Sequence, residues 1–121
     1  MSNWSRSVAG VQTLTELSGS ASISAGTLTL DLSTATTFYV SLNANITTLT
    51  ISNVQTPAAS AFTLIFTADG TARTVTWGGS IVWPGGTAPT LTSTNLKVDV
   101  FSFVTINGGT SWYGFTGGQN F

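Results

Sequence analysis

The sequence predicts an all-β protein: an antiparallel β-sandwich, jelly-roll-like in topology, with a short extended N-terminal arm. Three observations lead to this prediction. Apolar and polar residues alternate in several short runs, as the two faces of a strand require. Turn-forming residues separate these runs at intervals of roughly 8–12 residues, which is typical of sandwiches. No segment repeats its apolar residues at the helical period, and β-branched Thr and Val are abundant.

The first three predicted strands follow one another between residues 27 and 52. The run TLTLDL, residues 27–32, places its three leucines on one face, and FYVSL, residues 38–42, does the same with its apolar residues. In NITTLTIS, residues 45–52, Leu49 and Ile51 share a face. A turn-rich stretch around Pro57 ends this part of the chain.

A tight hairpin is predicted next. The run AFTLIFT, residues 61–67, is a strand, and Asp69-Gly70 suits the turn after it because glycine adopts positive φ without steric cost. The return strand is ARTVTW, residues 72–77. A short SIVW segment, residues 80–83, then leads into WPGGTAP, a loop that its two prolines fix outside the sheet.

The segment LKVDVFSFVTI, residues 96–106, differs from the others because apolar residues occupy both of its faces. Three valines alternate with Phe101 and Phe103. Such a strand belongs in the centre of a sheet or at an interface. The NGG turn at residues 107–109 predicts a hairpin to the last strand, TSWYGF, residues 110–115.

Two regions follow from this pattern. Residues 1–26 are rich in Ser, Gly and Thr and are predicted to form the arm, and residues 27–121 are predicted to form one β-sandwich domain. The arm either docks on a neighbouring molecule or is a frayed terminus. The chain has no apolar run of roughly 20 residues and no basic leader at Met1, so we expect a soluble, non-secreted protein without membrane insertion.

Charge is scarce. Charged residues make up 6% of the chain, against roughly 25% in an ordinary soluble domain. A weakly charged surface lacks the repulsion that keeps proteins apart, which predicts association with copies of the chain or with other proteins. Arg6, Arg73 and Lys97 are too few to neutralise several phosphates, so nucleic acid is not an expected partner.

The residues that most chemistry requires are absent. The chain has no histidine and no cysteine, which excludes imidazole catalysis, Ser-His-acid triads, thiolate metal sites and disulfides. No calcium-loop pattern occurs, and the glycine pairs lack the lysine of a phosphate-binding loop. We therefore expect no catalytic residue, no cofactor and no metal.

Asp99 is the carboxylate of most interest, because it lies in the two-faced segment on the same face as Phe101 and Phe103. A hydrolase would need it together with a second carboxylate across a cleft. The favoured interpretation is a surface or subunit-contact carboxylate held by Lys97 or by a backbone amide, since buried charges persist only when paired.

Large aromatic side chains are numerous for a small chain. Core or interface packing is the favoured role of the tryptophans, and stacking on a sugar is the alternative. The predicted interface candidates are Asp99, Phe101, Phe103, Trp83, Trp112 and Tyr113.

The C-terminal half resembles a module of phage virion proteins. Three runs carry the likeness: RTVTWGGSIVWPGGTAPTLT, KVDVFSF and INGGTSWYGFTGGQNF. The stretches from Trp83 to Pro89 and from Gly108 to Phe115 are its most specific parts. Overall, the region from Leu28 to Phe121 is similar to structural proteins of cyanophages and other marine phages.

The resemblance implies a β-rich virion component that is commonly trimeric and is not an enzyme. In that family the module often ends tail-fibre-like chains, whereas here it takes up nearly the whole sequence. We therefore expect a capsid cement protein, a homotrimer that bridges major capsid subunits. The alternative is a tail-fibre tip or receptor-binding head that contacts host glycans through Trp and Tyr. A hydrolase based on Asp99 is the third and least favoured hypothesis.

Overall fold

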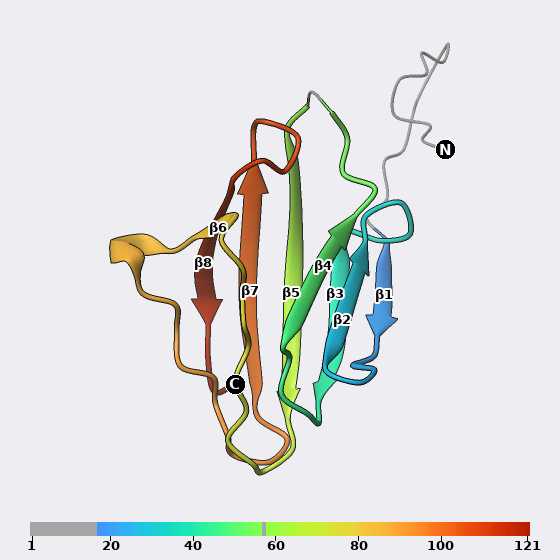
Figure 1. Ribbon diagram of the computed structural model, residues 1–121. Helices are drawn as coiled ribbons and strands as arrows, with labels where there is room; N and C mark the ends of the chain where they lie inside the picture. The colour runs from blue at the N-terminus through green and yellow to red at the C-terminus, as the bar shows by residue number, and fades with distance from the viewer. Residues whose placement is uncertain (1–16, 57) are drawn as a thin grey trace, which may run out of the picture.

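The computed structural model describes residues 17–56 and 58–121, which form two layers of β-strands (Figure 1). The larger layer is a six-stranded sheet in the order β1-β3-β5-β7-β8-β6, and the smaller layer is the pair β2-β4. The described residues contain no α-helix, only a short 3-10 turn at Pro84–Gly86. This confirms the predicted all-β fold. The strands are β1 (Ser18–Ala21), β2 (Thr27–Asp31), β3 (Thr37–Leu42), β4 (Thr48–Ser52), β5 (Ser60–Ala68), β6 (Ile81–Val82), β7 (Val98–Thr105) and β8 (Trp112–Gly118).

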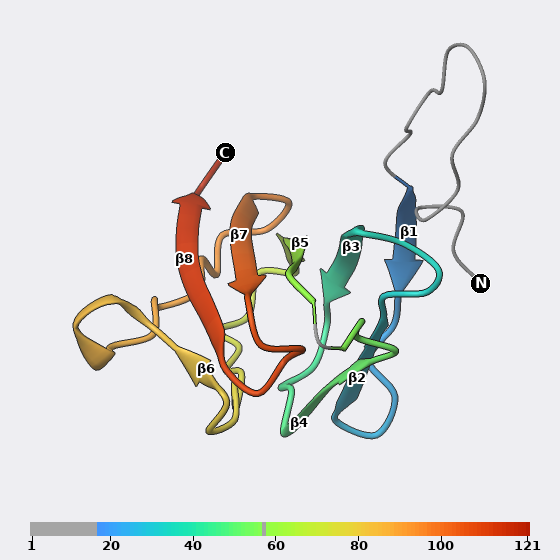
Figure 2. The same cartoon turned by 90° about the horizontal axis from the view of Figure 1, so that it is seen from above.

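From β1 to β5 the chain winds as a short solenoid, because successive strands alternate between the two layers. β1, β3 and β5 lie side by side and parallel in the large sheet, and β2 and β4 are parallel in the small one. Ser18 stands beside Thr37 and Thr27 beside Thr48, so one coil takes about 20 residues. Figure 2 shows β2 and β4 together on one side of β3 and β5.

The antiparallel jelly roll is not confirmed, because four of the six strand pairings are parallel. Side chains alternate with a period of two in parallel and antiparallel strands alike, so the pattern carries no information on strand direction. Strand direction is set here by the connections, which cross from one layer to the other. When the chain leaves the large sheet and returns to it one coil later, the new strand runs parallel to the previous strand of that sheet.

The C-terminal half is mainly antiparallel and matches the prediction more closely. β5, β7 and β8 pair antiparallel, with β7 between the other two, as its two-faced pattern indicated. The predicted turn between β7 and β8 is present, and Gly108 and Gly109 adopt φ values of 69° and 89° that favour glycine. The strand β6 pairs parallel with β8 at the sheet edge.

The predicted hairpin at Asp69-Gly70 is wrong. Gly70 does turn the chain, with φ at 88°, but residues 72–77 do not return along β5. Both edges of β5 are already taken, by β3 and by β7. Val75 instead forms an isolated parallel bridge with Ile46, just before β4, where a third coil of the solenoid would run.

The core lies between the layers and has two parts. In the solenoid, Leu28 and Leu30 of β2 are fully buried against the inner residues of the large sheet. Along that sheet, Phe38 stands beside Leu64 and Val40 beside Phe66. Full burial of such side chains stabilises the fold by about 1.5–3 kcal/mol each.

The second part of the core is aromatic. The small sheet does not cover β7 and β8, and the connection between β5 and β7 packs there instead, with Trp77 and Trp83 inward. The Trp83 ring lies 5.0 Å from the Trp77 ring and 5.6 Å from the Phe103 ring, both in edge-to-face geometry. The proline-rich loop after Trp83 is outside the sheet, as predicted.

The N-terminal region only partly follows the predicted boundary. Ser18–Ala21, within the expected arm, is strand β1 and pairs with β3, so the sheet begins before Thr27. Residues 1–16 of the expected arm lie outside the described residues. Over the described ranges, no helix is long and apolar enough to cross a membrane.

Candidate functional site

The structure places five of the six interface candidates inside the chain. Phe101 and Phe103 are fully buried, Trp112 and Trp83 are nearly so, and Asp99 is 3% exposed. These aromatic residues contact one another through the core: Phe103 stacks on Phe62 at 4.7 Å, and Trp112 meets Phe62 edge-on at 5.0 Å. Tyr113 is the exception, with 53% of its surface open.

Trp77, Trp83 and Trp112 follow the core-packing interpretation rather than the sugar-stacking one. A ring that stacks on a glycan must present an open face, and neither Trp83 nor Trp112 has one. The indole N–H of Trp83 is buried without a hydrogen-bond partner. Glycan contact would therefore have to use exposed rings, such as Tyr39 and Tyr113.

Asp99 is the second residue of β7, and its carboxylate accepts hydrogen bonds from two other segments of the chain. Its Oδ2 accepts hydrogen bonds from the backbone N–H of Thr92, at 2.8 Å, and from Nε2 of Gln119, at 3.0 Å. Its Oδ1 accepts the backbone N–H of Asn120, at 3.0 Å. The carboxylate thus ties the Thr92 loop and the C-terminal tail to the central strand.

This arrangement explains the charge state of Asp99. Burial raises the pKa of the carboxyl, but the hydrogen bonds from Thr92, Gln119 and Asn120 outweigh burial and hold the pKa below its ordinary value. Backbone amides hold the group, as one of the two predicted alternatives had it, and Lys97 forms no ion pair with it. A general acid would need the opposite shift, toward a raised pKa.

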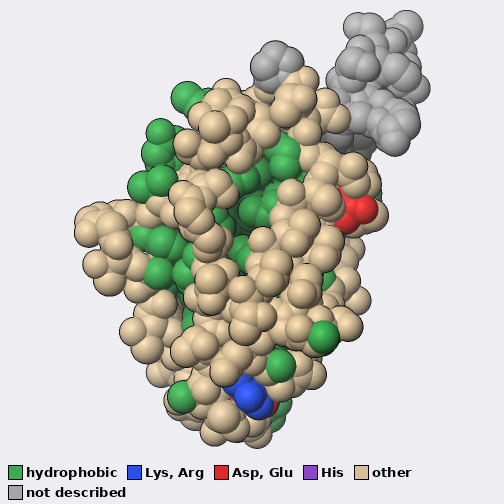
Figure 3. All heavy atoms as spheres, viewed as in Figure 1, with side chains coloured by type: hydrophobic (Ala, Val, Ile, Leu, Met, Phe, Trp, Pro, Cys, Tyr) green, Lys and Arg blue, Asp and Glu red, His purple; other side chains and the backbone are tan. Residues whose placement is uncertain are grey.

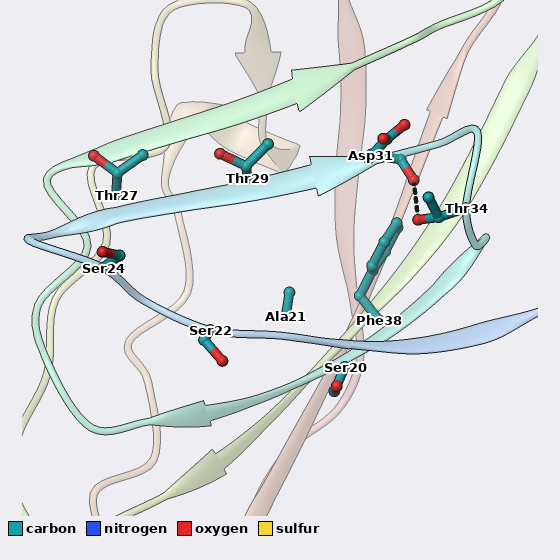
Figure 4. A pocket seen from close by; sticks show the side chains of 9 residues that line it. All are labelled: Ser20, Ala21, Ser22, Ser24, Thr27, Thr29, Asp31, Thr34 and Phe38. Carbon is teal, nitrogen blue, oxygen red and sulfur yellow. Dashed lines mark hydrogen bonds between the residues drawn. The ribbon is translucent and has the colours of Figure 1, made fainter.

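A polar groove opens at the first coil of the solenoid, between β1 and β2 (Figure 4). The groove has a volume of about 510 Å³, and the side chains of Ala21, from β1, and Phe38, from β3, contribute its apolar lining. Hydroxyl side chains line the rest, from Ser20, Ser22, Ser24, Thr27, Thr29 and Thr34. The groove lies at the free edges of β1 and β2, each of which pairs on one side only.

Asp31 is the acidic residue of this groove, and local structure already occupies it. Its Oδ1 accepts the backbone N–H and the hydroxyl of Ser33, at 2.9 and 2.6 Å, and Nδ2 of Asn53 at 2.7 Å. The Asn53 hydrogen bond, followed by those from Ser33, lowers the pKa of Asp31. Asp31 closes the turn after β2 and carries no proton for acid catalysis at neutral pH.

The remaining chemistry of the described part is sparse. No group of three or more acidic, histidine or cysteine side chains is placed to hold a metal among residues 17–56 and 58–121. Asp69 and Arg73 pair with each other at 2.6 Å beside the turn after β5. The face drawn in Figure 3 carries only isolated charged side chains among apolar and uncharged polar ones.

The exposed side of β7 is the face that the predicted interface candidates do not include. The two-faced pattern of residues 96–106 predicts a contact through Phe101 and Phe103, whereas in the structure both side chains fill the core. The other face carries Val98, Val100 and Val104, which are only partly buried. The neighbouring strand β8 adds Tyr113 and Phe115, both exposed.

Comparisons of the chain with protein-family models, with curated proteins and with solved structures gave no match. The resemblance to phage virion modules is therefore carried by the residues quoted for it and stays a prediction.

Proposed function

We propose that this chain is a non-enzymatic structural protein of a phage virion, a cement or decoration protein that associates as a homotrimer and stabilises the capsid lattice by binding major capsid subunits. The observation that carries the proposal is that the surface of residues 17–56 and 58–121 is almost free of unpaired charge and bears apolar side chains on the outside of the sheet.

The charged residues of the described part support this proposal because most are already engaged. Asp69 and Arg73 form an ion pair, Asp99 is buried under three hydrogen-bond donors, and Asp31 is bonded to Ser33 and Asn53. Lys97 is the cation left over in residues 17–56 and 58–121. Such a surface can be covered by another protein with little desolvation of charge.

The polar groups described above support a structural role rather than catalysis. Each acidic residue of the described ranges holds a turn or a neighbouring segment through hydrogen bonds, and each has a pKa below its ordinary value. Carboxylates of this kind hold loops in place and make poor general acids.

A second candidate is a tail-fibre tip, which one feature of the solenoid favours. β1 and β2 are both edge strands, at the same end of the first coil. Edges of this kind can be continued by further parallel coils, so the domain could stack on a shaft. Host glycans would then meet exposed tyrosines.

The two candidates differ in copy number. Quantitative mass spectrometry of purified virions, from a phage whose genome encodes the chain, should find it at a number comparable with the major capsid subunit if it is a cement protein. A few copies per particle, with immunogold label at the tail, would instead identify the fibre tip. Absence from virions would rule out both.

Binding to capsids is the direct test of the cement function. Purified protein should sediment with undecorated capsids and raise the temperature at which they break open. An otherwise folded protein that leaves capsids bare would count against the cement proposal.

A further inference from the structure

The outer face of the six-stranded sheet carries large apolar side chains among Ser and Thr residues, although the solvent-facing side of a sheet is normally polar throughout. We define this outer face as the outward side chains of β3, β5, β7 and β8. The pairing places Tyr39, Ile65 and Val100 in one row across three strands. The next row consists of Thr37, Thr63, Ser102 and, on β8, Phe115, so that hydroxyl side chains separate its aromatic ring from the other edge. None of the outward residues on these four strands is charged.

Two further aromatic residues extend this face along β8. Tyr113 stands beside Val104 on the adjoining strand. Phe121 hydrogen-bonds through its backbone to Val98, and its ring lies where a side chain at Gly118 would stand. Because Gly118 is the partner of Val100, the Phe121 ring continues the row that begins at Tyr39.

The described second layer does not cover these side chains. The strands β2 and β4 lie on the opposite side of the sheet, against its inner residues (Figure 2). Tyr39 is 52% exposed, Tyr113 53%, Phe115 44% and Phe121 66%. A monomer that keeps four such rings in water exposes a patch of the kind that marks a protein contact.

The face is large enough for a specific contact. At roughly 200 Å² per aromatic side chain, four half-exposed rings leave about 400 Å² open, and the aliphatic and hydroxyl residues between them bring the face to roughly 600 Å². Two such faces pressed together remove about 1,200 Å² from water, which is at the lower end of the range for specific stable interfaces.

We propose that the outer face is covered by a second copy of this chain, so that copies associate sheet to sheet through Tyr39, Phe115 and their neighbours. The inference goes beyond the homotrimer of the proposed function, because two identical faces pressed together close a twofold pair and not a threefold ring. The absence of charge favours this occupant. The outer face has no charged side chain that needs a partner of opposite sign, and when it packs on a second uncharged face no charged group is removed from water. Sheets that pack face to face lie about 10 Å apart, with rings and aliphatic side chains interdigitated.

Sedimentation equilibrium of the purified full chain tests this proposal. Wild type should be oligomeric at micromolar concentration. Phe115→Lys and Tyr39→Lys, which place a charge on the face at strands on opposite sides of β5 and β7, should each weaken association by roughly tenfold or more. The matched control is Thr50→Lys, an exposed position on β4 in the other layer, which should leave association unchanged.

Both face variants alter exposed side chains, so circular dichroism and thermal unfolding should report folded proteins. A monomeric wild type, or an oligomer that neither face variant weakens, would overturn the proposal. The sheet-to-sheet contact and the virion role can fail separately. A monomer that still binds capsids would contradict the contact and support the virion role. An oligomer that depends on the outer face but is absent from virions would support the contact and contradict the virion role.

Discussion

Asp99 is a buried anion held by donors rather than by a cation, and this determines how the protein responds to substitution there. Asp99→Asn keeps the shape of the side chain but turns an amide NH₂ toward donors from Thr92, Gln119 or Asn120. We expect a loss of about 1–3 kcal/mol in the free energy of unfolding, measured by denaturant titration. The matched control, Asp69→Asn at the exposed ion pair, should cost much less.

The pKa shifts predict how stability depends on pH. The folded pKa of Asp99 is below its ordinary value, near 3.9 in an unfolded chain, so its contribution to stability is complete above that value. The contribution is lost as the pH falls from about 4 through the folded pKa. Unfolding measured from pH 7 down to acid should show this decline.

Asp99→Asn should flatten the acid decline, and Asp31 and Asp69 should leave a residual slope, because their pKa values are lowered as well. An unchanged pH profile in the variant would show that Asp99 is not among the groups that titrate with unfolding.

At the scale of the strands, the turn between β7 and β8 depends on one buried hydroxyl. Thr105 is fully buried, and its Oγ1 donates to Oδ1 of Asn107, at 2.9 Å, and accepts the backbone N–H of Gly109, at 3.0 Å. Thr105→Val leaves that N–H without a partner and should cost about 1–3 kcal/mol.

Unfolding in denaturant, together with faster amide exchange at Gly109, would report the loss at Thr105. Thr105→Ser keeps the hydroxyl and is the control: it should retain slow exchange at Gly109 even though it loses a methyl group. Equal exchange rates in the two variants would contradict the role given to the hydroxyl.

The strands themselves were largely predictable from the sequence, and their partners were not. Alternation located β2, β3, β4, β5 and β7, because burial on one face fixes which residues are apolar. The same rule indicated a strand at residues 72–77, where Val75 and Trp77 do point inward but both edges of β5 are occupied. Which edges are free is a property of the whole sheet and cannot be read from a local run.

The candidate site was predictable only in part, for a related reason. The two apolar faces of β7 are visible in the sequence, but a face full of Phe and a face full of Val look equally suited to a contact. The structure assigns the larger side chains to the core because the inner space beside Trp77 and Trp83 must be filled. Among the predicted interface candidates, Tyr113 of β8 is the one whose side chain is exposed.

For the molecule as a whole, Trp83 joins the proline-rich segment to the central sheet. Trp83→Ala removes a ring that contacts Trp77, Phe101 and Phe103, and should cost about 3–5 kcal/mol. A loss of unfolding free energy of that size should lower the melting temperature by more than about 10 °C. Val82→Ala, at the exposed neighbouring position, is the control and should change the melting temperature by only a few degrees.

The expected destabilisation by Trp83→Ala determines which variants can be used to test glycan binding. A loss of binding in Trp83→Ala would reflect unfolding, so binding assays should use Tyr39→Ala and Tyr113→Ala, whose rings are open. If either tyrosine variant abolished glycan binding while remaining folded, the fibre-tip candidate would gain direct support.

The parallel coils also affect how such a chain can change length. Each coil gives one strand to each layer and meets only the coils beside it, and strand partners in successive coils are 19 to 26 residues apart (Ser18 and Thr37, Thr37 and Thr63). A whole coil can be added or removed with every remaining strand still paired, whereas a partial insertion shifts inward residues outward. Related proteins should therefore differ in the N-terminal half by multiples of one coil, while the antiparallel half from β5 onward keeps a constant size.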